Sequence, residues 1–346
     1  MQEKISTYFA AANSYRGFIS YFDKIFPSTE FEKIFVLKGG PGTGKSSLMR
    51  SISQKLGSEG FDIEHILCSS DPKSLDGVIA QKDHKKIAVI DGTAPHERDA
   101  VIPGAVDEIV NLGHNWDERW LRAKRSEILS LNEDKRSAYK TAYNYLKIAG
   151  ECSSAMDEVR TKHFRKTEAK SEAERILSSI STFGEGQIST RLFSSFGRLG
   201  DYSIKPQKDQ FSRVVSVGGE ADMFLKVCQD LLISKGANMT IFPSAKDPKK
   251  LDALLINDEK ILILSDEKDE IDAGEFFVIP PVDKEKSRLA SELHRELLIE
   301  SARWFKIASE IHFTLEEIYS SAMDFTRNDA LLSEIYAKIG LIYENS

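Results

Sequence analysis

Short apolar runs alternate along the chain with longer segments in which apolar residues recur every three or four positions. The runs "KIFVLK" (33–38), "FDIEHIL" (61–67) and "KIAVI" (86–90) are rich in β-branched and aromatic residues and predict buried strands. The segment "KSSLMRSISQKL" (45–56) predicts a helix directly after the first strand. Strands and helices that alternate in this way predict an α/β fold, with a parallel sheet flanked by helices.

Two later regions, about 117–180 and 283–340, are polar and carry apolar residues at helical spacing. This spacing places the apolar side chains on one face of a long helix. We expect the two faces to pack together, the first through Tyr139, Ala142, Leu146, Ala149 and Met156, the second through Leu298, Ser301, Phe305, Ala308 and Leu315.

The chain also contains an internal repeat. The stretch "FVLKGGPGTGKSSLMRSI" (35–52) aligns with "VVSVGGEADMFLKVCQDL" (214–231), and D-P-K-x-L-D occurs at 71–76 and again at 247–252. Self-similarity with the elements in the same order indicates a duplicated structural unit. We therefore expect two units, residues 1–183 and 184–346, each with a sheet and a long helical extension.

Composition fits this organisation. The 346 residues are enough for two domains, and no segment approaches the roughly 18 uninterrupted apolar residues of a membrane span. The net charge of −7 gives no strong nucleic-acid signal, although it allows a local basic patch. Three widely spaced cysteines and an N-terminus without the pattern of a signal peptide predict a cytoplasmic protein with free thiols.

The stretch "GGPGTGKSS" (39–47) carries the clearest chemistry. Gly39, Gly44, Lys45 and Ser46 satisfy G-x-x-x-x-G-K-[ST], the phosphate-binding P-loop, or Walker A, motif. Glycines let backbone N–H groups surround a phosphate, the following helix adds its positive end, Lys45 adds a charge, and the Ser46 hydroxyl is a ligand for Mg²⁺. The motif predicts binding of a nucleoside triphosphate, ATP with Mg²⁺, through Gly39, Gly40, Pro41, Gly42, Thr43, Gly44, Lys45, Ser46 and Ser47.

Asp91 ends the strand "IAVI" and is the candidate partner of Ser46 in holding the metal. The alternative is that Asp91 only shapes a turn. Many ATP-hydrolysing motors place a Glu after this Asp, whereas this chain has Gly92. His96 and Glu97 are the nearest polar residues that could replace that Glu, and a solvated loop is the alternative for both.

The segment "CSSDPKSLDGV" (68–78) follows the second strand and should open near the terminal phosphate. Asp71 or Asp76 could orient a water or accept a proton there. However, the second unit keeps the same motif, which favours a structural role such as a capped helix start. Arg98 is either a lid or transition-state arginine or an ordinary surface residue.

The second unit has lost the phosphate-binding groups. Phe224 and Leu225 align with Lys45 and Ser46, and Glu220 and Asp222 fall within the loop. Carboxylates without a lysine repel a triphosphate. The second unit is thus predicted to keep the fold without binding nucleotide, in a structural or regulatory role.

These motifs together resemble a little-characterised bacterial family of tandem P-loop ATPases, over nearly the whole length. Relatives often keep a phosphate loop in the second unit, so this chain departs from the family there. The resemblance implies ATP binding more than any particular substrate. It rests on "GGPGTGKS" (39–46), "CSSDPKSLDGV" (68–78), "DGTAPH" (91–96) and "PGAV" (103–106).

Three functions are compatible with this sequence. The first is a Mg²⁺-dependent ATPase in which unit one hydrolyses ATP and repositions the helices or a protein partner. The second is a small-molecule or nucleoside kinase, favoured by the missing Glu after Asp91 and by the acidic 68–78 segment. The third is a scaffold that binds ATP without turnover. A ring-forming motor fits less well because of the missing Glu and the repeat within one chain.

Overall fold

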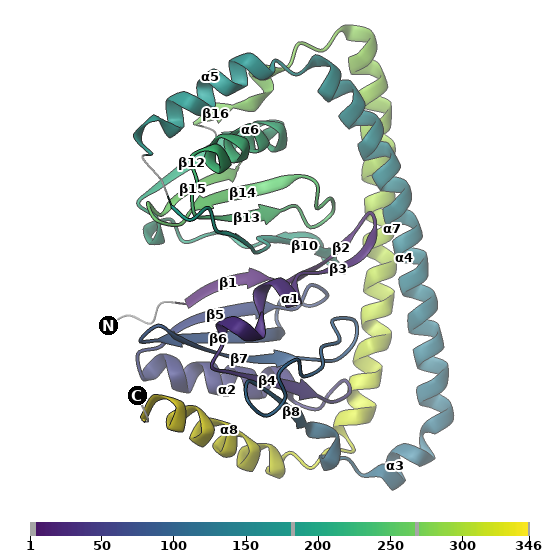
Figure 1. Cartoon of the computed structure of the whole chain (residues 1–346). Coiled ribbons are helices and arrows are strands. Elements are labelled where there is room, and N and C mark those ends of the chain that lie inside the picture. Colours follow the sequence, from purple (N-terminus) through teal and green to yellow (C-terminus); the bar gives the residue numbers. More distant parts are fainter. Residues whose placement is uncertain (1–4, 181–183, 267–269, 345–346) are drawn as a thin grey trace.

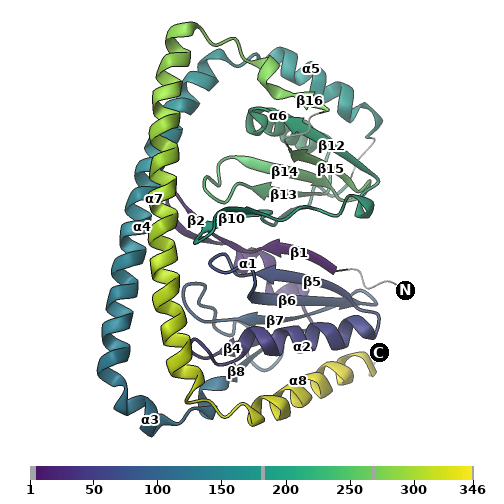
Figure 2. The ribbon, with the colours of Figure 1, turned by 180° about the vertical axis from the view of Figure 1, so that it is seen from behind.

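The computed structural model describes residues 5–180, 184–266 and 270–344. Two six-stranded sheets lie one above the other, and two long helices run along one side of both (Figure 1). Both chain ends lie on the side away from these helices (Figure 2). The expected boundary between the units, at residue 183, falls at residues 181–183, outside the described residues.

The first sheet has the order β1-β5-β6-β7-β4-β8. The expected parallel sheet is in fact mixed, because β6 runs antiparallel to both neighbours while the remaining pairs are parallel. The strands are β1 (Ile5–Phe9), β4 (Lys33–Lys38), β5 (Asp62–Leu67), β6 (Leu75–Lys82), β7 (Lys85–Asp91) and β8 (Asp107–Asn111).

A tight hairpin explains the antiparallel strand. Asp83 and His84 join β6 to β7 with φ of 49° and 66°. Left-handed backbone at two successive positions matches the twist of a two-residue hairpin. The sequence does not predict β6 because the turn is Asp-His, without the Asn-Gly or Asp-Gly pair that usually marks such turns.

The second sheet repeats this topology strand for strand. Its order is β9-β13-β14-β15-β12-β16, and β14 is again the strand that runs antiparallel to both neighbours. The strands are β9 (Ile188–Thr190), β12 (Arg213–Gly218), β13 (Met239–Pro243), β14 (Leu251–Ile256), β15 (Ile261–Ser265) and β16 (Ile271–Asp272). The shared topology agrees with the repeat seen in the sequence.

Helices and two small hairpins complete each half. A helix follows the glycine-containing turn after β4 and β12, namely α2 (Lys45–Ser58) and α6 (Ala221–Ser234). The small hairpins, which lie between the sheets and the long helices, are β2–β3 (Ala11–Ser14, Gly17–Ser20) and β10–β11 (Ser194–Gly197, Gly200–Ser203). The other helices are α1 (Phe22–Ile25), α3 (Glu118–Ala123), α4 (Arg125–His163), α5 (Lys166–Ile176), α7 (Pro281–Ser320) and α8 (Thr326–Glu344).

The two long helices pack along their length, as the apolar faces predict. Ala142 and Leu146 of α4 share one buried cluster with Phe305 of α7, and these three side chains are at most 3% exposed. The buried Ser301 hydroxyl donates to the Ala142 carbonyl oxygen across the pair at 2.9 Å. Since α4 and α7 come from different halves of the sequence, this pair ties the halves together.

The short helices that follow the long pair are exchanged between the halves. Helix α5 follows α4 but packs on α6 and the second sheet, where Ala169 and Ala173 join the core. Helix α8 follows α7 but packs on α2 and the first sheet, where Ile335 and Ile339 are each 1% exposed. Each sheet is therefore covered by a helix from the other half of the sequence (Figure 1).

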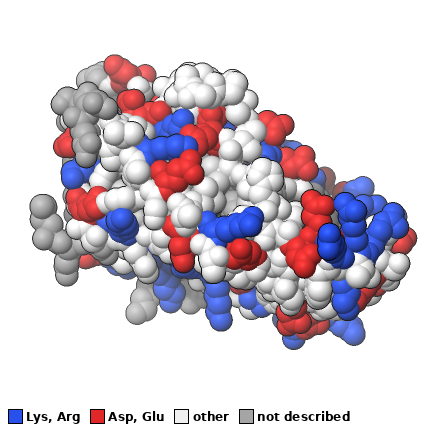
Figure 3. Space-filling model, turned by 90° about the horizontal axis from the view of Figure 1, so that it is seen from below, with Lys and Arg blue, Asp and Glu red and all other residues white. Residues whose placement is uncertain are grey.

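Among the described residues, the long helices α4 and α7 included, no helix has the length and apolar character of a membrane span. Viewed from below, the face mixes charges of both signs, with Lys and Arg gathered at the end of the long helices (Figure 3). Residues 119–125, in α3 and at the start of α4, include four basic residues, Arg119, Arg122, Lys124 and Arg125. Two of them pair with neighbouring glutamates.

Candidate functional site

The glycine loop, residues 39–47, connects β4 to α2 at the carboxyl edge of the first sheet. Gly42 and Gly44 have φ of 69° and 83°, a backbone region that glycine enters without the cost paid by other residues. Within the described residues, the backbone N–H groups of residues 42–47 donate no hydrogen bond to the protein. A run of unpaired N–H groups at a helix start is a suitable site for an anion.

The Lys45 ammonium group lies inside this loop. It donates to the carbonyl oxygens of Gly39 and Gly40, each at 2.9 Å, and lies 3.6 Å from Asp91 Oδ2. The side chains of Lys45 and Asp91 are only 11% and 13% exposed. Asp91 reaches this position because β7 pairs directly with β4, with Leu37 opposite Asp91. The structure thus brings together the predicted lysine and the predicted strand-ending carboxylate.

Ser46 and Asp91, the predicted metal ligands, are both held in place by neighbours. The Leu75 N–H donates to Ser46 Oγ at 2.9 Å, and Thr93 donates to Asp91 Oδ1 through its N–H and its hydroxyl. No group of three or more His, Cys, Asp or Glu residues forms a metal site in the described part of the chain. A Mg²⁺ ion bound with a nucleotide takes most of its ligands from phosphates and water, and one hydroxyl and one carboxylate are the groups available here.

Asp76, the second residue of strand β6, forms a buried pair with His96. Asp76 Oδ2 lies 3.2 Å from His96 Nε2, and both side chains are less than 10% exposed. Burial, together with the nearby Asp91 carboxylate, raises the pKa of Asp76 to about 8. Burial lowers the pKa of His96. At neutral pH, then, a protonated Asp76 carboxyl donates to a neutral His96 ring, so the pair carries a proton without a net charge.

Asp71, the other carboxylate of the 68–78 segment, pairs with Arg198 and not with His96. Its Oδ1 accepts from Arg198 Nη2 at 2.7 Å and from the Lys73 N–H at 3.3 Å. Its carbonyl accepts from the Ser74 N–H, and the second half repeats this turn at Asp247. Asp71 therefore shapes a turn in the first half, and Asp247 shapes the same turn in the second. This agrees with the predicted structural role, but the turn leads into strand β6 and not into a helix.

Arg98 is buried, so it is neither a lid arginine nor a surface residue. Its Nη2 donates to Ser28 Oγ at 3.0 Å and to Asp107 Oδ1 at 3.4 Å. Burial raises the pKa of Asp107, but hydrogen bonds from the Ile102 N–H and the Ser28 hydroxyl, together with the Arg98 guanidinium, lower it overall. Arg98 therefore fixes the connection before β8. Glu97, by contrast, is exposed, as expected for a solvated loop.

The C-terminal helices lie directly on the glycine loop. A Cβ atom at Gly42 would lie 2.5 Å from the Glu316 carbonyl oxygen of α7. Asn328 of α8 donates to the Thr43 carbonyl oxygen at 3.2 Å and accepts from Asn115. These contacts were not predicted, because they join positions far apart in the sequence.

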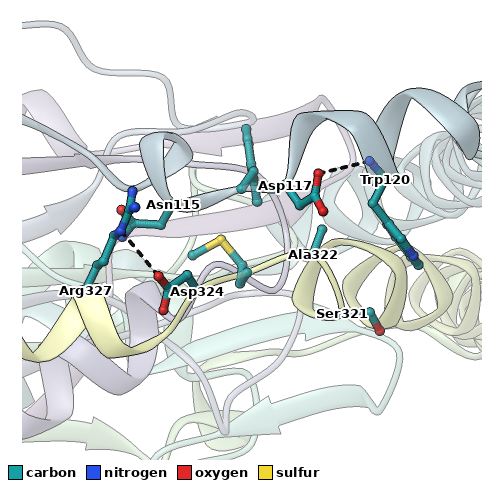
Figure 4. A pocket seen from close by; sticks show the side chains of 9 residues that line it. Asn115, Asp117, Trp120, Ser321, Ala322, Asp324 and Arg327 are labelled. Carbon is teal, nitrogen blue, oxygen red and sulfur yellow. Dashed lines mark hydrogen bonds and ion pairs between the residues drawn. The ribbon is translucent and has the colours of Figure 1, made fainter.

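A hollow of about 390 Å³ lies beside these contacts, between residues 115–120 and the turn from α7 to α8 (Figure 4). Trp116 lines it and also approaches the loop, since a Cβ atom at Gly40 would lie 3.1 Å from the Trp116 ring. Asp117 accepts from the Trp120 N–H, and Asp324 accepts from the Thr326 N–H. Both acidic side chains of the hollow therefore accept hydrogen bonds from backbone N–H groups at the start of a helix, Asp117 at α3 and Asp324 at α8.

The equivalent loop of the second half is built differently. Phe224, which aligns with Lys45, is fully buried and stacks on Phe276 with ring centroids 5.4 Å apart. Glu220 accepts from Arg160 of α4 at 2.5 Å, and Lys250 lies 2.7 Å from Asp157 of the same helix. Apolar packing thus occupies the positions of the lysine and the hydroxyl, Phe224 and Leu225, and ion pairs hold the loop and the 247–252 segment to α4.

Comparison with protein-family models finds no matching family, and comparison with curated proteins and with solved structures finds no match either.

Proposed function

We propose that the first half binds a nucleoside triphosphate, ATP with Mg²⁺, at the glycine loop and hydrolyses it slowly, while the second half serves as a nucleotide-free structural or regulatory partner. The observation that carries this proposal is the combination of unpaired N–H groups in residues 42–47 with the Lys45 ammonium group among them. Such a site offers both hydrogen bonds and positive charge to the β- and γ-phosphates.

The neighbouring side chains support a role in phosphoryl transfer. Ser46 and Asp91 are the residues that would hold Mg²⁺, one directly and one through water. The Asp76–His96 pair, whose members are linked at 3.2 Å, can accept a proton from an attacking hydroxyl once Asp76 has lost its own proton, and the Asp76 pKa of about 8 keeps that ionised form within reach near neutral pH. The Mg²⁺ ion would spread the negative charge of the transferred phosphoryl group.

Gly92 favours slow hydrolysis, and it also favours a kinase as the second candidate function. A Cβ atom at Gly92 would lie 2.3 Å from Val36 Cγ1 and 3.0 Å from the Arg98 carbonyl oxygen. A glutamate therefore does not fit directly after Asp91 without a backbone shift. That glutamate orients the attacking water in many ATPases. Without it, hydrolysis is expected to be slow, and a substrate hydroxyl can take the place of water as the phosphoryl acceptor.

Incubation of the purified protein with γ-labelled ATP and Mg²⁺, alone and with a pool of cell metabolites, separates the functions. Phosphate release without an acceptor supports the ATPase, and a labelled small product supports the kinase. Nucleotide binding without label transfer supports a scaffold. The same experiment with GTP tests the preference for the base.

The matched variants are Lys45→Ala and Lys147→Ala. Lys147 is an exposed lysine in the middle of α4 and lies outside the glycine loop. Loss of the Lys45 ammonium group should weaken MgATP binding by about thirtyfold or more, as for other charge-assisted hydrogen bonds. Lys147→Ala should bind like the parent. Equal binding by Lys45→Ala and the parent would disprove the proposal.

A further inference from the structure

The second half reaches into the first through its hairpin β10–β11. The hairpin lies against the segment after β5, and a Cβ atom at Gly197 would lie only 3.3 Å from the Ser69 carbonyl oxygen. Asn13 of the first half donates to the Phe196 carbonyl oxygen at 2.7 Å. Since Arg198 directly follows Gly197, this close approach carries an arginine of the second half to the first half.

Arg198 is held there by an ion pair, and one of its buried donors has no acceptor among the described residues. Its Nη2 donates to Asp71 Oδ1 at 2.7 Å, and its guanidinium lies 5.3 Å from the ring centre of Phe313 on α7. Its Nε is buried and has no hydrogen-bond acceptor within the described residues. A buried N–H without an acceptor is costly, and a guanidinium binds best to an oxyanion that accepts from Nε and an Nη together.

Arg198 is connected to the glycine loop through the turn at Asp71. The Ser74 N–H closes a turn onto the Asp71 carbonyl oxygen at 2.8 Å, and the next residue, Leu75, donates to Ser46 Oγ. A continuous series of contacts, from Arg198 through Asp71 and Ser74 to Leu75, thus links the guanidinium to the Ser46 hydroxyl of the glycine loop. Rotation about the long Arg side chain covers a distance of several ångströms.

We propose that Arg198 is a nucleotide-sensing arginine that the second half supplies to the site of the first. When a triphosphate occupies the glycine loop, the guanidinium leaves Asp71 and pairs with the terminal phosphate through Nε and Nη2. The terminal phosphate has more negative charge than a carboxylate and can accept both hydrogen bonds. This inference rests on the proposed nucleotide binding and gives the nucleotide-free half a role in it.

The test compares Arg198→Ala and Arg198→Lys with Arg191→Ala in the full-length protein. Arg191 also crosses between the halves, pairing with Glu64 at 2.5 Å, and the two arginines are similarly buried at 17% and 22% exposed. Arg191 directly follows β9, the edge strand of the second sheet, and its partner Glu64 lies on β5, whereas the glycine loop follows β4. Affinities for MgADP and for a non-hydrolysable MgATP analogue are measured by equilibrium dialysis, and turnover is measured with γ-labelled ATP.

Contact with the terminal phosphate predicts that Arg198→Ala binds MgADP like the parent but loses about tenfold or more in affinity for the MgATP analogue. Turnover should fall by at least about a hundredfold, and Arg198→Lys should not restore it. An unchanged preference for the analogue over ADP, or the same losses in Arg191→Ala, would overturn the inference. If the parent binds neither nucleotide, the proposed function fails and the inference fails with it. If Lys45→Ala loses the preference for the MgATP analogue over MgADP while Arg198→Ala keeps it, the inference alone is overturned.

Discussion

Arg160 of α4 donates to Glu220 in the loop of the second half at 2.5 Å, whereas Tyr319 of α7 lies beside the glycine loop of the first half, 3.8 Å from where a Cβ atom at Gly40 would be. Each long helix therefore contacts the loop of the other half, α4 through an ion pair and α7 through an aromatic ring. Burial raises the pKa of Glu220 while Arg160 lowers it. The second loop lacks both the lysine and the hydroxyl, and an ion pair with α4 holds it, so substitution at one position does not restore a phosphate site.

Phe224→Lys, which restores the lysine of the motif, should unfold the second half without creating a nucleotide site. The substitution places an unpaired charge where Phe224 is 0% exposed and stacked on Phe276. We expect the free energy of unfolding to fall by about 4 kcal/mol or more, measured by urea denaturation. Met223→Lys, at the partly exposed neighbouring position, is the control and should cost much less. Stable binding of MgATP by a doubly substituted Lys45→Ala, Phe224→Lys protein would contradict this.

Gly42→Ala and Gly60→Ala separate backbone strain from contact with α7. Both glycines have positive φ, 69° and 84°, so alanine costs about 1–2 kcal/mol at either position. Only at Gly42 would the new Cβ meet another residue, the Glu316 carbonyl oxygen at 2.5 Å, since no atom lies within 4 Å of a Cβ at Gly60. We expect Gly42→Ala to lower the melting temperature further and to increase hydrogen exchange in α7. Equal effects of the two substitutions would show that α7 does not rest on the loop.

The sequence predicts the parts of this fold that depend on neighbouring residues. The periodic apolar positions of α4 and α7, such as Leu146 and Phe305, predict the helix pair, and the pattern of 33–38 predicts β4. The α/β class is confirmed, but the parallel sheet is not, because the Asp83-His84 turn has no strong sequence signal. The exchange of α5 and α8 depends on which surface each helix meets, and their amphipathic patterns alone do not identify it.

The candidate site divides in the same way. Lys45 and Asp91 are predicted from local motifs, and the structure brings them together at 3.6 Å because their strands pair. Asp76 and Asp71 could not be separated from the sequence, since both lie in one polar segment and only burial distinguishes them. Arg198 carries no motif, and its relation to Asp71 comes entirely from the packing of one half on the other.

Ile335→Ala should show that the last helix stabilises the first sheet. Ile335 is 1% exposed and packs in the same cluster as Leu48 and Met49 of α2. Loss of the side chain should lower the free energy of unfolding by about 2–5 kcal/mol, because the remaining cavity cannot close fully. Leu293→Ala on α7, at a position 54% exposed, is the matched control and should cost less than about 1 kcal/mol. Similar costs in urea denaturation would mean that α8 does not stabilise the first half as packed here.

Asp76→Asn should remove one source of pH-dependent stability. Because the folded protein raises the Asp76 pKa to about 8, it keeps a proton that the unfolded chain has already lost above about pH 4. This contribution to stability is therefore lost as pH rises toward 8. His96, with its lowered pKa, acts in the opposite direction, but only below about pH 6.5, where the unfolded histidine gains a proton.

Between about pH 6.5 and 8 the effect of Asp76 should therefore stand apart from that of His96. Across that range the variant should gain stability relative to the parent with rising pH, at a slope of up to about 1.4 kcal/mol per pH unit for one proton. Above about pH 9 the difference should level off, since Asp76 is then ionised in both states of the parent. Urea denaturation of parent and variant at half-unit pH steps measures this difference directly. A difference that stays constant from pH 6.5 to 9 would show that Asp76 does not hold its proton in the folded protein, and the neutral Asp76–His96 pair would then have to be replaced by an ion pair.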